Sequence, residues 1–61
     1  MTMDDVFKED IGRKVLYRPS HGDSEEGVIV DFNATYIFVR FGNDVGSKAC
    51  RPENLEWINV T

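Results

Sequence analysis

The stretch "VIVDFNATYIFVRFG", residues 28–42, decides the fold of this chain. Two apolar runs, each alternating with period two, flank Asn33-Ala34-Thr35, which has the composition of a tight turn. The alternation predicts a β-hairpin with one face of each strand directed at a core. The predicted core faces are Val28, Val30 and Phe32 on the first strand, and Ile37, Val39 and Phe41 on the second.

Further short strands are predicted on both sides of this hairpin. In "KVLYR", residues 14–18, Val15 and Tyr17 alternate with Lys14, Leu16 and Arg18, which predicts a strand with the latter three facing outward. Residues 47–50 predict another short strand, and a last strand begins at Leu55, with Trp57 at the core or rim. The connections follow from composition: a loop at 19–27, a turn at "GNDVG" and one turn of 3₁₀ helix over Pro52 to Leu55.

The N-terminal segment has a different period. Met3, Phe7 and Ile11 recur at spacing four beside Val6, which predicts a short helical segment within residues 1–10 with one apolar stripe. Gly12 follows, as glycine commonly does where a helix ends. Together these patterns predict a mainly β fold: one domain over residues 1–61, with five strands closed into a small barrel over 11–61.

Size and composition restrict the function classes. A chain of 61 residues makes a single domain with a thin core and leaves little room for a deep cleft. One cysteine and one histidine complete neither a disulfide nor a zinc site, so we expect no metal and no cofactor. The acidic start "MTMDDVFKED" and the lack of a long apolar run predict a cytoplasmic protein without a membrane partner.

The net charge of −4 argues against a general nucleic-acid binder, but the charges are segregated. Residues 1–10 carry −3 and residues 52–61 carry −2, whereas the 41 residues between them carry +1. The middle of the chain therefore holds the cations available to a partner.

The order "IGRKVLYRP", an acidic loop, "EGVIVDFN", "YIFVRFG" and then "SKACRPENLEW" resembles SH3-like barrels of the Tudor and KOW type. It is similar in particular to small SH3-like proteins encoded by bacteriophages and prophages. The similarity covers residues 11–57, and its most specific parts are the glycine-led second strand and the "RPENLEW" turn. The resemblance implies a fold more than an activity, because such barrels carry many unrelated functions.

The predicted binding surface lies on the outward side of the second hairpin strand. If Ile37, Val39 and Phe41 face the core, the alternating side chains face outward, and aromatic rings with interleaved cations suit a protein or nucleic-acid partner. The alternatives are that residues 3–7 of the same chain or a second copy cover this surface. The predicted binding residues are Tyr36, Phe38, Arg40, Arg18, Lys48 and Arg51.

No group of residues predicts catalysis. Ser20, His21 and Asp23 are the residue types of a hydrolytic triad, but they lie almost adjacent in one loop without a scaffold. Cys50 has no base or second thiol in sequence reach, and the acidic loop residues match no calcium-loop spacing. We therefore expect a non-enzymatic binding module of the phage accessory type that acts through protein contacts. The alternatives are a KOW- or Tudor-like nucleic-acid binder and a self-associating structural protein that forms a homodimer.

Overall fold

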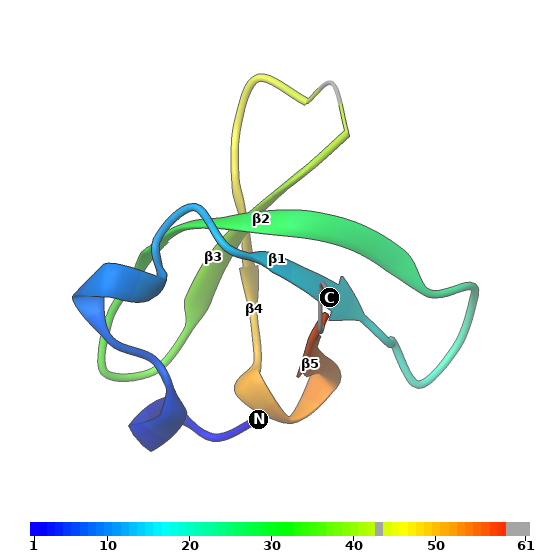
Figure 1. The fold of residues 1–61 in the computed structure, drawn as a ribbon. Coiled ribbons are helices and arrows are strands. Elements are labelled where there is room, and N and C mark those ends of the chain that lie inside the picture. Colours follow the sequence, from blue (N-terminus) through cyan, green and yellow to red (C-terminus); the bar gives the residue numbers. More distant parts are fainter. Residues whose placement is uncertain (43, 59–61) are drawn as a thin grey trace.

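The computed structural model describes residues 1–42 and 44–58. The described residues form five antiparallel strands in one sheet, in the order β4-β3-β2-β1-β5, with three short 3₁₀ helices (Figure 1). The strands are β1 (Lys14–Tyr17), β2 (Glu25–Phe32), β3 (Ile37–Phe41), β4 (Lys48–Cys50) and β5 (Leu55–Trp57). The 3₁₀ helices are η1 (Met3–Asp5), η2 (Lys8–Asp10) and η3 (Pro52–Asn54).

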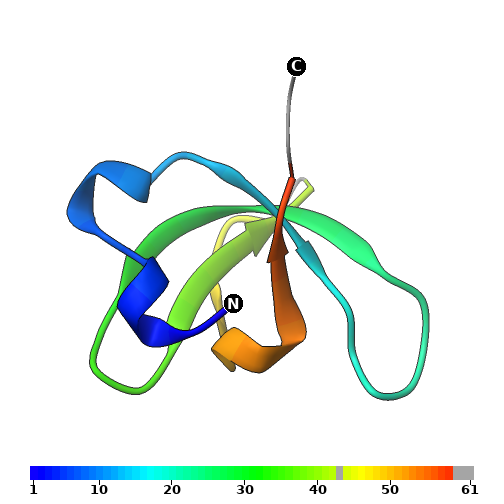
Figure 2. The same cartoon turned by 60° about the horizontal axis from the view of Figure 1, so that its bottom comes forward.

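The sheet is strongly curved but open. Figure 2 shows β1 and β2 arching over η3 and the N-terminal residues. Within the described part of the chain, no ladder joins β4 to β5, so these two strands form the edges of the sheet. The mainly β, five-stranded prediction is therefore confirmed, whereas a closed barrel is not what these strand pairings show.

The concave face of the sheet holds the core. Its fully buried side chains are Val15, Ile29, Ile37, Val39 and Leu55, and Val6, Phe41 and Cys50 complete the buried cluster. Tyr17, Phe32 and Trp57 pack against this cluster while remaining partly exposed. The predicted core positions Val15, Ile37, Val39 and Phe41 are thus confirmed, and Trp57 lies at the rim as expected.

A β-bulge in β2 overturns the predicted faces of that strand. Ile29 pairs with Val39 and Asp31 pairs with Phe38, so Val30 is the extra residue between them. Ile29 is consequently fully buried, whereas Val30 is 37% exposed, the reverse of the predicted arrangement. The extra residue shifts the alternation by one, which brings Phe32 back to the core face beside Ile37.

Strand β2 also begins earlier than its composition indicates. Residues 25–27 were expected in the loop, but Glu25 pairs with Tyr17 and Glu26 with Leu16. Gly27 lies on the core face, where a Cβ would collide with the side chain of Val39 and approach Phe41 Cδ1 at 2.9 Å. Glycine at this position lets β2 cross close to β3 at the bend of the sheet.

The turn between β2 and β3 is fixed by Asn33. Its Oδ1 accepts hydrogen bonds from the N–H of Thr35 (2.8 Å) and of Tyr36 (2.7 Å), and its own N–H donates to Tyr36 O (2.9 Å). Tyr36 therefore belongs to the turn, and β3 begins at Ile37, one residue later than predicted.

The N-terminal segment contains two 3₁₀ turns in place of the predicted single helix. Asp5 accepts bonds from Thr2, and Asp10 Oδ2 accepts the N–H of Phe7 (2.8 Å), so each turn is closed by its own carboxylate. The backbone between the turns is extended, and the spacing-four stripe is lost. Val6 is buried, but Phe7 is 58% and Ile11 is 43% exposed.

These bonds lower the pKa values of both carboxyl groups. The backbone N–H of Thr2 and then its hydroxyl lower the pKa of Asp5, and the N–H of Phe7 followed by the Arg13 guanidinium lowers that of Asp10. The second turn ends with Ile11 as its C-cap, and Gly12, with a φ of 97°, then directs the chain into β1.

Candidate functional site

The outer face of the sheet, opposite the core, carries three half-buried apolar side chains. Leu16 on β1, Val28 on β2 and Phe38 on β3 alternate with core residues along their strands. The ladders pair Leu16 with Glu26, Val28 with both Lys14 and Arg40, and Phe38 with Asp31. Leu16, Val28 and Phe38 therefore follow one oblique line across three strands, which we call the apolar strip.

Charged residues border the apolar strip, and most of them are paired. Lys14 Nζ lies 3.6 Å from Glu26 Oε1, and the Arg18 guanidinium lies 2.9 Å from Glu56 Oε1. These pairs are exposed, so each contributes little to stability. Among the described residues, Arg40 takes part in no ion pair, and its cross-strand neighbour is the apolar Val28. In particular, Arg40 forms no ion pair with the acids Asp31 and Glu56.

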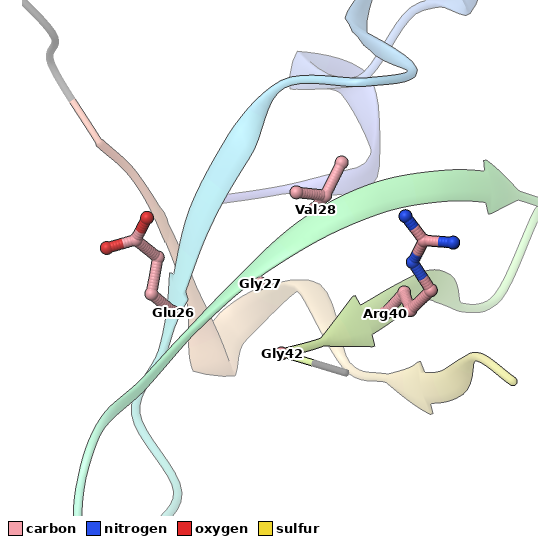
Figure 3. A pocket seen from close by; sticks show the side chains of 5 residues that line it. All are labelled: Glu26, Gly27, Val28, Arg40 and Gly42. Atoms are coloured by element: carbon pink, nitrogen blue, oxygen red, sulfur yellow. The ribbon is translucent and has the colours of Figure 1, made fainter. Parts of the chain in front are cut away.

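A shallow depression of about 220 Å³ lies beside the strip. It is lined by Glu26, Gly27, Val28, Arg40 and Gly42 (Figure 3). Figure 3 shows the side chain of Val28 between those of Glu26 and Arg40. Glu26 and Arg40 therefore place one acid and one base beside the depression, on either side of Val28.

The structure brings together only part of the predicted binding set. Phe38 and Arg40 are neighbours on the outer face of β3, and Arg18 lies on the same face after β1. Tyr36 lies half-buried in the turn before β3. Phe38 and Arg40 are therefore the centre of the candidate surface.

Lys48 and Arg51 lie apart from that centre. Lys48 pairs in register with the buried Val39, which places it on the core side of edge strand β4. Arg51 follows β4 and lies 3.7 Å from Glu53, the second residue of η3. These cations were grouped with Arg40 on charge alone, because the sequence does not reveal the β3–β4 register that separates Lys48 from Arg40.

Two residues of this surface were missed by sequence reasoning, since Val28 was assigned to the core and Glu26 to a loop. Leu16 was placed correctly on the outward side of its strand. The signal that could have placed Val28 and Glu26 is Gly27, since a glycine inside a strand marks a bend or a close backbone approach. Counting alternation from Gly27 as an inward position puts both Glu26 and Val28 on the outer face.

The N-terminal segment packs on the opposite side of the sheet. Val6 belongs to the buried core cluster, and Met1 and Met3 pack against it. Phe38 is half-buried, with its strand neighbours Ile37 and Val39 in the core and its own side chain on the outer face. The idea that residues 3–7 cover Phe38 is therefore not what the packing shows.

The described residues that the sequence offered for catalysis lie in the loop between β1 and β2 and in β4. Ser20, His21 and Asp23 are exposed in the loop between β1 and β2. Cys50 is buried, and burial raises the pKa of its thiol even though Lys48 acts in the opposite direction. Among the described residues, no group of three or more histidine, cysteine or acidic side chains is arranged to hold a metal ion.

Comparison with known proteins gives no match: no family model, no curated protein and no solved structure is similar to this chain. Over residues 1–42 and 44–58, no helix is both long and apolar enough to span a bilayer.

Proposed function

We propose that this chain is a non-enzymatic SH3-like module that binds another protein through the apolar strip and Arg40. The observation that carries the proposal is the combination of half-buried Phe38 and Val28 with Arg40, which has no ion-pair partner among the described residues. Aromatic side chains and arginine are the residues that supply most of the binding energy in protein interfaces.

The SH3-like part of the proposal rests on the order of elements. Five short antiparallel strands follow one another, the longest loop lies between β1 and β2, and η3 joins β4 to β5. The 3₁₀ turn after Arg51 lies where the sequence resemblance predicts it, with Pro52 as its first residue. The curvature of β1 and β2 over η3 supports the same assignment (Figure 2).

A protein partner fits the charges of this face better than a nucleic acid does. The strand register and the Arg18–Glu56 contact place three bases and three acids on this face, so the charges balance in number: Lys14, Arg18 and Arg40 against Glu26, Asp31 and Glu56. A nucleic-acid surface needs an excess of cations to displace the counterions of phosphate groups. Lys48 and Arg51, which could add to such an excess, lie elsewhere on the molecule.

Because the chain resembles small phage and prophage proteins, the proposal includes a phage or prophage origin for it. A phage accessory module of this type binds a host or phage protein and alters its activity by steric contact. The affinity then comes from the apolar strip, while the bordering charges set the orientation of the partner.

Affinity capture from cells of the native host tests the proposed surface. The baits are the wild-type chain, Phe38→Ser, Arg40→Glu and the control Lys48→Glu, which makes the same charge change on the opposite side of the sheet. We expect a partner protein retained by the wild type and by Lys48→Glu but lost from the other two. Circular dichroism of each bait shows whether the sheet is intact.

Two results would contradict the proposal. One is a bound protein that all four folded baits retain equally, since the partner would then use another surface. The other is binding that disappears on nuclease treatment, which would favour the nucleic-acid alternative.

A further inference from the structure

The depression beside the apolar strip is self-complementary in charge. Glu26 and Arg40 lie on opposite sides of Val28, and the structure records no ion pair between them. In the β2–β3 ladder Val28 pairs with Arg40, and Glu26 lies two residues before Val28 on the same face. The acid and the base are therefore diagonal neighbours across one ladder, separated by the apolar side chain.

A two-fold axis between these residues would turn this arrangement into an interface. In a dimer with such an axis, residue i of one subunit contacts residue j of the other, and j contacts i. With the axis parallel to the sheet and midway between Glu26 and Arg40, each Arg40 faces the Glu26 of the second copy. Val28 then lies close to the axis, where it meets the second copy's equivalent side chain.

We propose that the outer face binds a second copy of this chain through reciprocal contacts between Arg40 and Glu26. The occupant is inferred from charge, since one patch supplies both members of the pair and needs no charge from elsewhere. Lys14 is the existing neighbour of Glu26, but the pair is exposed and its 3.6 Å separation is long for a hydrogen bond. Gly42, where a Cβ would meet nothing within 4 Å, leaves one side of the depression open to incoming side chains.

This inference rests on the proposed function in that the binding face is the same, but it names the partner as the chain itself. The experiments below and above distinguish a failure of the dimer from a failure of host-protein binding. Host-protein capture that depends on Phe38 would support the module even if the chain is monomeric. A homodimer that depends on Glu26 and Arg40 would support the present inference even if no host protein is captured.

Charge-reversal variants studied by sedimentation equilibrium test the dimer. The wild type, measured up to about 1 mM at low salt, is expected to reach twice the 7.0 kDa mass of the chain. Arg40→Glu alone and Glu26→Arg alone place like charges opposite each other at both contacts, so each is expected to be monomeric. An equimolar mixture of these two variants restores opposite charges at both contacts and is expected to form a heterodimer.

The control Lys48→Glu carries the same charge change on the core side of β4 and is expected to dimerise like the wild type. If a charge reversal unfolds the chain, Arg40→Gln and Glu26→Gln provide milder variants, each expected to weaken the dimer about tenfold. A monomeric wild type over the whole concentration range would overturn the inference. So would a mixture of the two reversed variants that stays monomeric while each variant is folded.

Discussion

Arg13 lies over the indole ring of Trp57, with its guanidinium carbon 4.2 Å from the ring centroid. The same guanidinium donates a hydrogen bond of 3.0 Å to Asp10 Oδ1. Asp10 in turn accepts the N–H of Phe7, so one arginine connects the N-terminal segment to β5. Residues distant in sequence are held together at the rim of a thin core.

Removing the arginine cation should therefore weaken the fold. Arg13→Met keeps an unbranched apolar stem but loses the cation–π contact, which is worth about 0.5–1 kcal/mol at an exposed site, together with the hydrogen bond to Asp10 Oδ1. We expect the free energy of unfolding, measured by urea titration with Trp57 fluorescence, to fall by more than the cation–π contact alone would give. Arg51→Met, at a cation paired only with exposed Glu53, should change it by less than about 0.5 kcal/mol. Equal effects of the two variants would show that neither contact of Arg13 contributes to stability.

Acid should remove the contribution of Asp10. Its folded-state pKa lies below the ordinary value of 3.8, first because the N–H of Phe7 and then because Arg13 stabilise the carboxylate. A lowered pKa means that the stabilisation is fully present above pH 3.8 and is lost as the pH falls through the folded-state pKa. Asp10→Asn should accordingly lower the urea midpoint at pH 7, and its difference from the wild type should shrink below pH 3.8. Asp4→Asn is the control, since no described hydrogen bond reaches that carboxylate, and a constant Asp10→Asn difference down to the acid limit would contradict this account.

Gly27 should not tolerate a side chain. An alanine Cβ would collide with Val39 and lie 2.9 Å from Phe41 Cδ1 and 3.0 Å from the backbone O of Arg40. Overpacking of this kind costs about 1–3 kcal/mol. Gly46→Ala is a matched control, because a Cβ there meets nothing within 4 Å. Thermal unfolding should show a clear loss for Gly27→Ala and no loss for Gly46→Ala, and similar midpoints would mean that β2 and β3 are farther apart than described.

The bulge in β2 predicts opposite results at two adjacent residues. Ile29→Thr removes apolar volume at a fully buried site and buries a hydroxyl, which should cost about 2–5 kcal/mol. Val30→Thr keeps the β-branched shape at a site that is 37% exposed and should change stability by less than about 0.5 kcal/mol. Urea unfolding of both variants distinguishes this register from the simple alternation, which would reverse the order.

Much of the fold follows from period-two alternation, and its failures have local causes. The pattern placed Val15, Ile37, Val39 and Leu55 correctly because their strands are regular. It failed in β2 because a bulge inserts one residue without any compositional mark, so that Ile29 and Val30 exchange faces. It failed in the N-terminal segment because two carboxylates close separate 3₁₀ turns, which local spacing of apolar residues does not reveal.

The candidate site was harder to predict than the core. Phe38 and Arg40 were found because they alternate with core residues on a regular strand. Their neighbours Glu26 and Val28 were missed, since their faces depend on the start of β2 and on the close crossing at Gly27. Lys48 was grouped with Arg40 by charge, but only the β3–β4 register shows that it lies on the other side of the sheet.

The two edge strands of the open sheet are both very short. β4 and β5 contain three residues each, whereas β2 at the centre contains eight. An unpaired edge is a template on which another chain can add a strand, and a short edge offers few backbone groups for such growth. Lys48 adds a charge at the β4 edge, which further opposes the addition of a foreign strand. The brevity of its edges therefore protects this small open sheet from fibril-like aggregation, a task that other folds accomplish by closing the sheet.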